Sequence, residues 1–205
     1  MAHGSALCVT TLHPDLPQPA IDDDLRTAVL PALLLKPGLT DAFVGRRVED
    51  AGERVLATIW RSEREASGAE DVAAWPGSRV DRAPVRIAIR PDHREPARIL
   101  RVFRGEVRPG ELDAYVAEVR DGTLADAGSN PGLVALFLGA TGPDTFLTVS
   151  AWVEWSAIEE ATGGDTRRPV ATRNSARLTR LAVGHYEILP NAESMVAGVL
   201  DTPGR

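Results

Sequence analysis

The sequence has too little of several residue types to support whole classes of protein. A single cysteine, Cys8, cannot form a disulfide within the chain. The longest apolar run, residues 28–35, contains Pro31 and is much shorter than the roughly 20 residues that a membrane-spanning helix needs. The first residues lack the charged and then apolar pattern of a signal peptide. We therefore expect a cytoplasmic protein with no membrane partner.

Clustered positive charge and cofactor motifs are also scarce. The formal net charge is −6, whereas a nucleic-acid partner requires a clustered basic face to neutralise phosphates. No stretch matches G-x-G-x-x-G, a P-loop, G-x-S-x-G or C-x-x-C. His3, His13 and His93 have no second ligand at metal-binding spacing. We expect no nucleic acid, no cofactor and no metal.

What the sequence does contain is one stretch that occurs twice. Residues 36–65 align with residues 130–160, and five identities are each 94 positions apart. The identical pairs are Pro37 and Pro131, Gly38 and Gly132, Leu39 and Leu133, Phe43 and Phe137, and Gly45 and Gly139. The second copy has a hairpin shorter by two residues, so Trp60 aligns with Trp152. A repeat of this length predicts two similar structural units.

Each copy has the pattern of a strand, a hairpin, a strand and a helix. Residues 133–139 and 145–152 are rich in branched and aromatic residues, and turn formers separate them at residues 141–144. An S-x-x-E sequence follows each hairpin, at residues 62–65 and 156–159. This sequence is typical of a helix N-terminus capped by its serine, here Ser62 and Ser156.

The flanking segments complete each unit. Residues 7–12 and 85–89 are predicted strands of the first unit, with a helix from residue 21 that Pro31 kinks or ends. Residues 99–107 and 181–189 are predicted strands of the second unit, with a helix over residues 111–124 and a polar connection over residues 162–180. Leu112, Tyr115, Val116 and Val119 form the apolar face of that helix.

Both units therefore read β-α-β-β-α-β, the ferredoxin-like arrangement of the α+β class. We expect a first unit at residues 6–90, a linker at 91–97 that contains two prolines, and a second unit at 98–190. A tail at 191–205 either docks or stays loose.

Two such units with a tryptophan at the end of the third strand resemble the dimeric α+β barrel superfamily, and within it the antibiotic-biosynthesis-monooxygenase-like family. The resemblance covers roughly residues 7–189 and rests on strand order, the Pro-Gly-Leu entry to the hairpin, and the Trp60 and Trp152 positions. Two subunits of that family usually pair to close a barrel. Here one chain is expected to supply both sheets, as a pseudo-dimeric barrel.

The resemblance implies several functions. Members include cofactor-free oxygenases of aromatic polyketides and haem-degrading oxygenases that use a first-strand asparagine, the third-strand tryptophan and a second-helix histidine. This sequence keeps the tryptophan, but Phe103 falls near the asparagine position and the second helices contain no histidine. Haem cleavage by that route is therefore not expected.

Six residues are candidates for a pocket between sheet and helices. Trp60, Trp152 and Phe103 would contact a flat substrate, although core packing is the commoner role for such residues. His185 would act as a general base and Tyr115 would direct its hydroxyl into the cavity. Tyr186 follows His185 on the closing strand, and since side chains alternate, only one of the two faces the helices. An ordinary hydrogen-bonded histidine and a core tyrosine are the structural alternatives.

The expected function is a cofactor-independent monooxygenase of an aromatic or polyketide-like small molecule. It would deprotonate its substrate, and the resulting carbanion would react with dioxygen. The alternatives are a non-catalytic small-molecule-binding or assembly module, and a haem-binding or haem-degrading protein. The arginines at 167, 168, 173, 177 and 180 would bind an anionic ligand or simply be solvated. An aromatic ligand and a second copy of the chain are the expected partners.

Overall fold

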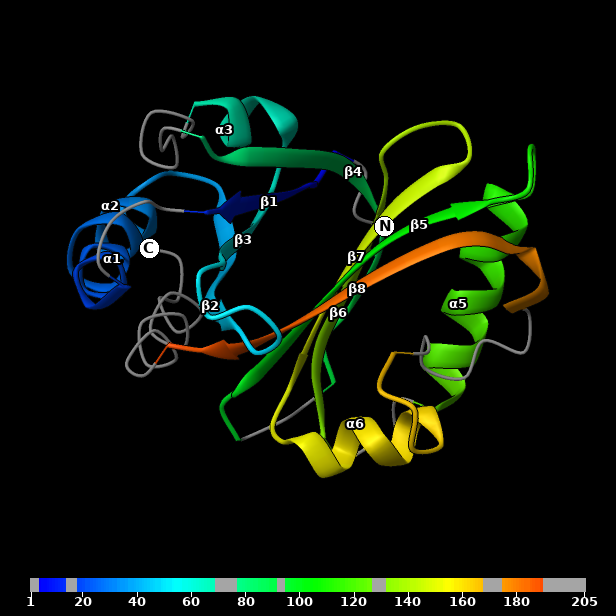
Figure 1. The fold of residues 1–205 in the computed structure, drawn as a ribbon. Helices are drawn as coiled ribbons and strands as arrows, with labels where there is room; N and C mark the ends of the chain where they lie inside the picture. The colour runs from blue at the N-terminus through cyan, green and yellow to red at the C-terminus, as the bar shows by residue number, and fades with distance from the viewer. Residues whose placement is uncertain are drawn as a thin grey trace.

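The computed structural model describes residues 4–13, 18–68, 77–91, 95–126, 132–167 and 175–189. Its centre is a closed antiparallel barrel with the strand order β1-β3-β2-β8-β5-β7-β6-β4 (Figure 1). The strands are β1 Ala6–Leu12, β2 Leu39–Arg47, β3 Arg54–Trp60, β4 Arg79–Ile89, β5 Ile99–Val107, β6 Leu133–Ala140, β7 Thr145–Trp152 and β8 Leu178–Ile188.

The barrel consists of two four-stranded halves with the same order. The first half runs β4-β1-β3-β2 and the second runs β8-β5-β7-β6. Pairing of β2 with β8 and of β4 with β6 joins the halves at two seams. The predicted α+β fold of two ferredoxin-like units in a pseudo-dimeric barrel is thereby confirmed.

Helices cover the outside of the barrel, with α1 and α2 on one side and α5 and α6 on the other (Figure 1). They are α1 Gln18–Asp24, the π-helix η1 Leu25–Val29, α2 Leu30–Leu34, α3 Glu63–Ser67, α5 Leu112–Asp126, α6 Trp155–Thr162 and the 3₁₀ turn η2 Ser175–Arg177. The N–H of Leu30 bonds to the carbonyl of Leu25, and Pro31 follows directly. Since proline has no N–H, the widened turn lies where a kink is expected.

One of the two predicted helix caps is correct. Ser62 caps α3, because its Oγ accepts the N–H of Glu65 at 3.3 Å. The second prediction is wrong: Glu154 is the N-cap of α6, and Ser156 lies inside its first turn. The two-residue shortening of the second hairpin persists beyond Trp152, so the helix begins two residues earlier than the alignment placed it.

Several predicted elements have different limits. Strand β4 begins at Arg79, six residues before the predicted start, and β8 begins at Leu178, inside the predicted polar connection. Both extensions are rich in arginine and polar residues, which obscured their strand character. Pro131 and the predicted tail at 191–205 lie outside the described residues. None of the described helices is both long and apolar enough to cross a membrane.

Side chains alternate between the barrel interior and the helix-covered outside. On β3, Arg54 faces outward, because its guanidinium bonds to Asp22 of α1 at 2.5 Å. The next residue, Val55, therefore faces inward. Leu100, Val102 and Phe137 are also fully buried and belong to the same apolar cluster as Val55. The barrel is thus a packed core whose polar features gather at its end.

Two glycines allow the halves to meet. Gly45 pairs with Ile188 at one seam, and Gly139 pairs with Val85 at the other. A Cβ atom at position 45 would lie 2.8 Å from the Cβ of Tyr186, and one at position 139 would lie 2.5 Å from the Cβ of Ala83. Real side chains do not approach so closely, so glycine at this repeated position permits the strand contact.

Candidate functional site at one end of the barrel

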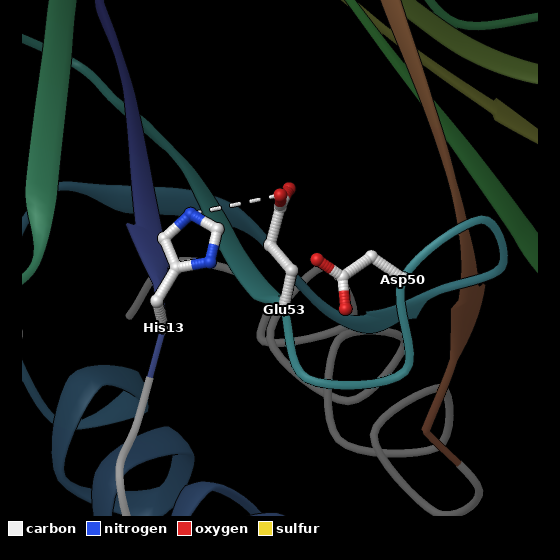
Figure 2. A group of neighbouring side chains, drawn as sticks. All are labelled: His13, Asp50 and Glu53. Atoms are coloured by element: carbon white, nitrogen blue, oxygen red, sulfur yellow. Dashed lines mark ion pairs between the residues drawn. The ribbon is translucent and has the colours of Figure 1, made fainter.

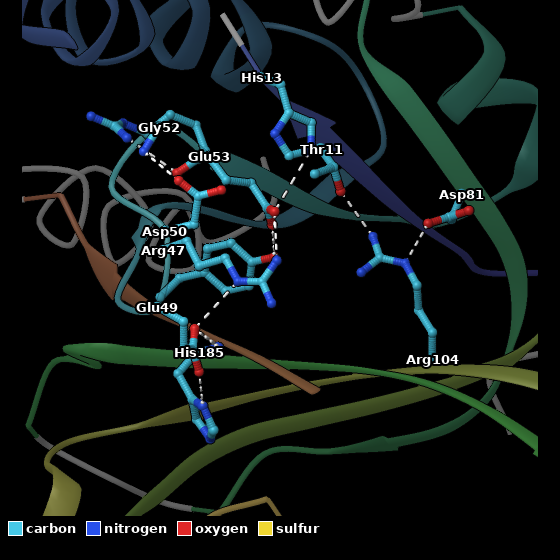
Figure 3. A network of polar contacts seen from close by, with 12 residues as sticks. Thr11, His13, Arg47, Glu49, Asp50, Gly52, Glu53, Asp81, Arg104 and His185 are labelled. Atoms are coloured by element: carbon cyan, nitrogen blue, oxygen red, sulfur yellow. Dashed lines mark hydrogen bonds and ion pairs between the residues drawn. The ribbon is translucent and has the colours of Figure 1, made fainter. Parts of the chain in front are cut away.

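Polar side chains gather where β1, β2 and β5 end and β3 begins. Glu53 is at the centre: it is only 3% exposed and immediately precedes β3. Its Oε2 accepts a hydrogen bond from Nη1 of Arg47 at 2.6 Å, and its Oε1 accepts one from the hydroxyl of Tyr186. The first half of the chain thereby holds a buried carboxylate against β8 of the second half (Figure 3).

The network continues from the barrel interior to the helix side of β8. Nε of Arg47 donates to Glu49 at 3.3 Å. The other carboxylate oxygen of Glu49 lies 2.6 Å from Nδ1 of His185, and Nε2 of His185 lies 3.0 Å from the carbonyl oxygen of Thr166. The hairpin between β2 and β3 therefore connects Glu53 inside the barrel with His185 outside it.

These contacts change the acidity of the groups that make them. Burial is the largest influence on Tyr186 and, together with the hydrogen bond and charge of Glu53, raises the pKa of its hydroxyl. Burial acts to lower the pKa of Arg47, but contact with Glu53 outweighs it, so the pKa is raised. Burial is the largest single influence on Glu49 and acts to raise its pKa, but the hydrogen bond to the His185 ring, backbone hydrogen bonds and the charge of His185 together outweigh it, so the pKa is lowered. At neutral pH the hydroxyl of Tyr186 is therefore protonated, and the side chains of Arg47 and Glu49 are ionised.

A half-open groove of about 390 Å³ adjoins this network. Arg104 is one of the residues that line it, and donates to Asp81 at 2.7 Å and to Oγ1 of Thr11 at 2.9 Å (Figure 3). Arginines contribute three of its lining residues, acids two and threonines two, and the other four are uncharged. The lining residues are Arg79, Asp81, Arg104, Gly105, Glu106, Thr141, Thr145, Phe146, Leu147, Arg180 and Ala182.

The groove and the Glu53 network occupy equivalent places in the two halves. Backbone and side chain both join Arg47 to Glu53, through N–H to carbonyl at 3.1 Å and guanidinium to carboxylate at 2.6 Å. In the other half Thr141 is joined to Thr145 in the same two ways, each at 2.9 Å. The shorter threonine side chains leave space where the first half has an ion pair, and that space is part of the groove.

Three metal-ligating side chains also meet at this end of the barrel. Ligand atoms of His13, Asp50 and Glu53 all lie within 4.8 Å of one another (Figure 2). Nε2 of His13 is 3.7 Å from Oε2 of Glu53. No spacing in the sequence indicates this group, because the β2–β3 hairpin brings Asp50 and Glu53 close to a histidine that follows a different strand, β1.

The structure places four of the predicted site residues on the helix side of the second half. Trp152, Phe103 and His185 are buried on that face, and Tyr115 packs against Phe146 from α5 with ring centroids 4.7 Å apart. Burial, and then the charge of Glu118, raise the pKa of Tyr115. These residues share a layer, but the groove described above lies at the barrel end and has none of them in its lining.

The remaining two predicted residues lie elsewhere. Trp60 has the position of Trp152 in the first half: each indole N–H donates at 2.9 Å to a hydroxyl two residues earlier, that of Thr58 or Ser150. Tyr186 faces the barrel interior, where it bonds to Glu53. His185 is thus the member of the pair that faces the helices, with Trp155 of α6 at a ring-centroid distance of 5.2 Å.

A buried polar row on the helix side was not predicted. Register places Arg101 directly between Ser150 of β7 and His185 of β8. Arg101 is fully buried, and its Nη2 donates to the same Thr166 carbonyl that His185 contacts. Burial lowers the pKa of Arg101 to about 10, so it stays positive at neutral pH. The sequence signal that could have located Arg101 is the alternation of side chains along β5, which puts Arg101 on the same face as Phe103.

Comparisons with known proteins find solved structures of the same fold but no match to a family model or a curated protein. A provisionally assigned monooxygenase from Fusobacterium nucleatum has 12% identity and a TM-score of 0.73, with 92% of this chain and 94% of that chain covered. An anthrone oxidase-like protein has 15% identity and a TM-score of 0.61, with 90% and 91% covered.

A third similar structure is a haem-degrading enzyme from Listeria monocytogenes, with 12% identity, a TM-score of 0.51, and 88% of this chain and 99% of that chain covered. Identities this low show a shared fold and do not by themselves assign a reaction to this chain. A ferredoxin-fold protein related to antibiotic biosynthesis monooxygenases is also similar. The resemblance inferred from the sequence is therefore confirmed at the level of the fold.

Proposed function

We propose that the protein binds a small anionic aromatic or polyketide-like molecule in the barrel-end groove and oxidises it with dioxygen as a cofactor-independent monooxygenase. The groove carries the proposal: about 390 Å³ is the size of a small-molecule site, and Arg79, Arg104 and Arg180 line it. A similar fold in proteins named for monooxygenase and anthrone oxidase activity supports the choice of reaction class.

The arginines suit the chemistry that such a reaction needs. Dioxygen reacts directly with an organic ring only when that ring is electron-rich, as in a phenolate or an enolate. Positive charge beside the substrate oxygen favours the ionised form and lowers the substrate's pKa. Asp81 holds Arg104 in place through a 2.7 Å hydrogen bond. Phe146, Leu147 and Ala182 provide the apolar part of the lining.

His185 is less available as a base than its residue type suggests. The Thr166 carbonyl can only accept a hydrogen bond, so Nε2 carries a proton when it makes that contact. The other ring nitrogen, Nδ1, lies 2.6 Å from Oε1 of Glu49, so both nitrogens are already in contact with acceptor oxygens. A base role for His185 needs one of these contacts to open, and stays a prediction.

The two alternatives make different demands on the same residues. A non-catalytic binding module would use the groove without oxygen consumption. A haem protein would need an axial ligand, and the histidines among the described residues are His13 at the barrel end and His185 with both nitrogens in contact. The arginine-lined groove favours an anionic small molecule over haem.

The test is oxygen uptake by the cofactor-free protein with a panel of hydroxyanthrones, phenols and quinols. Arg180→Gln removes an exposed groove charge, and Arg98→Gln removes an exposed arginine at the opposite end of the barrel. We expect Arg180→Gln to lower kcat/KM about tenfold, the value of one charge-assisted contact, and Arg98→Gln to leave it unchanged.

Three other results would reject the proposal. Binding without uptake would indicate the non-catalytic module, and a Soret band on adding haem would indicate a haem protein. Equal kcat/KM for wild type and Arg180→Gln, with loss of activity in His185→Gln, would move the reaction to the helix side of β8.

A further inference from the structure

The group formed by His13, Asp50 and Glu53 has the composition of a metal site. Its members come from three places: His13 follows β1, Asp50 lies in the β2–β3 turn, and Glu53 precedes β3. Their side chains point into one space, with all ligand atoms within 4.8 Å of one another (Figure 2). One imidazole and two carboxylates suit Zn²⁺ and neighbouring divalent transition metals.

Supporting contacts orient two of the three ligands. The Glu53 carboxylate is fixed by the Tyr186 hydroxyl on Oε1 and by Arg47 on Oε2. A carboxylate oxygen has a second lone pair, so Oε2 can bind a cation while it accepts a hydrogen bond. Asp50 accepts the N–H of Gly52 at 2.9 Å, which holds its carboxylate in the turn. Outer contacts of this kind strengthen metal binding in known sites.

The spacing is close to that of ligands around one ion. Bonds of about 2.0–2.2 Å place tetrahedral ligand atoms about 3.4 Å apart. Nε2 of His13 and Oε2 of Glu53 are already 3.7 Å apart. The remaining adjustment falls mainly on His13, which is exposed and can rotate, whereas Asp50 is held by Gly52 and Glu53 is buried.

We propose that His13, Asp50 and Glu53 bind one divalent transition-metal cation, such as Zn²⁺, at the end of the barrel beside the groove. Three protein ligands leave at least one coordination position open, which is typical of sites where the metal contacts a small molecule. The proposal does not rest on the oxidation proposed above, because its readout is metal binding. Without a metal, the exposed His13 ring merely lies near Glu53, with Nε2 at 3.7 Å from Oε2, a contact that contributes little to stability.

The test titrates the purified, chelator-treated full chain with Zn²⁺ by calorimetry and with Co²⁺ by visible absorption. We expect one equivalent to bind, with a Co²⁺ spectrum of low coordination number. His13→Gln and Asp50→Asn each remove a ligand from an exposed position, so both variants should fold. Each should weaken binding by about tenfold or more. His93→Gln and Asp23→Asn are matched controls and should bind as the wild type does.

Two outcomes would overturn the site. One is an absence of stoichiometric binding at micromolar Zn²⁺ and Co²⁺. The other is equal affinity in the wild type, His13→Gln and Asp50→Asn, which would place the metal elsewhere on the chain. Metal binding with no oxygen uptake would leave this site standing and reject only the oxidation.

Discussion

Glu53 determines the character of its side of the barrel end, because it places a buried carboxylate where the second half of the chain has threonines and an open groove. A buried carboxylate is tolerated only with strong partners. Arg47 and Tyr186 supply these, from β2 and β8. Removing either partner would leave charge or a hydroxyl unsatisfied, so we regard the three side chains as one unit.

The two tyrosines of the chain provide a test of this environment. The pKa of each is raised, mainly by burial, with Glu118 adding to the effect at Tyr115 and Glu53 at Tyr186. We expect the native protein to show no tyrosinate absorption at about pH 10.5, whereas the urea-unfolded chain ionises near pH 10.

The sign of the linked stability follows. Above pH 10 the unfolded state loses tyrosine protons that the folded state keeps, so the free energy of unfolding falls as pH rises. The fall is up to about 1.4 kcal/mol per pH unit for each tyrosine. Tyr115→Phe and Tyr186→Phe should each reduce this fall in the free energy of unfolding by the contribution of one tyrosine, as measured by urea titrations at several pH values above 10. Native ionisation near pH 10 would contradict the burial of both hydroxyls.

Residue-level prediction from the sequence succeeded for packing and missed the polar end of the barrel. The periodic face of Leu112, Tyr115, Val116 and Val119 is buried as expected. Glu53 and Arg104 gave no such signal: each is a charged residue beside a turn or in a strand, where exposure is the ordinary outcome. Their inward direction depends on register and closure, which a single sequence does not specify.

The β2–β3 hairpin and the β6–β7 hairpin differ in length and charge, and this difference separates the two sides of the barrel end. The longer hairpin carries Arg47, Glu49, Asp50 and Glu53, and reaches β8 through a 2.8 Å bond from the N–H of Val48 to the carbonyl of His185. The shorter one carries threonines that border the groove. The β2–β3 hairpin thus fills its side of the barrel end with charged side chains, whereas the β6–β7 hairpin leaves the space that forms part of the groove.

Substitution of the seam glycines tests how tightly these strands meet. Gly45→Ala and Gly139→Ala each place a methyl group within 3.0 Å of another Cβ atom, and at position 139 the carbonyl oxygen of Pro84 is also 2.9 Å away. We expect each change to lower the free energy of unfolding by about 1–3 kcal/mol in urea titrations.

Gly122→Ala is the matched control for the seam glycines. Gly122 lies in α5 with no atom within 4 Å of an added Cβ. That change should raise stability by about 0.5–1 kcal/mol, since alanine is the better helix former. A neutral or stabilising effect at positions 45 and 139 would show that the seams can open without loss.

At the level of elements, strand pattern was more informative than helix-cap pattern. The limits of β5 and β7 agree with the prediction, because both strands are rich in branched and aromatic residues and have clear turns beside them. The cap at Ser156 was wrong because an S-x-x-E sequence also fits the interior of a first turn. Only the hairpin length decides which residue reaches the cap position.

Closure within one chain is the property that belongs to the whole molecule. Every strand has two neighbours in the order β1-β3-β2-β8-β5-β7-β6-β4, and β4 pairs with β1 to complete the circle. The seam between β2 and β8 is nevertheless short: it runs from the Gly45–Ile188 pair to the Arg47–Tyr186 pair, and the earlier part of β8 pairs with β5 alone. The expected second copy could therefore associate through helices, loops or this unpaired edge of β8.

We accordingly predict that folding does not depend on a partner. The thermal midpoint should be unchanged between about 1 µM and 100 µM protein, because association of folded chains would raise it with concentration. Differential scanning fluorimetry over this range of protein concentration measures the midpoint. A midpoint that climbs with concentration would show that a second copy stabilises the fold.

The β2–β3 hairpin has a consequence for communication across the molecule. Its Glu49 holds His185 in the helix-covered layer of the second half, while its Glu53 stands among the side chains inside the barrel. A cation that drew Asp50 or Glu53 toward it would move the same short loop that orients His185 (Figure 3). Occupancy at the barrel end would then change the orientation of His185 beneath α6, so the loop would couple the barrel end to the helix-covered layer of the second half.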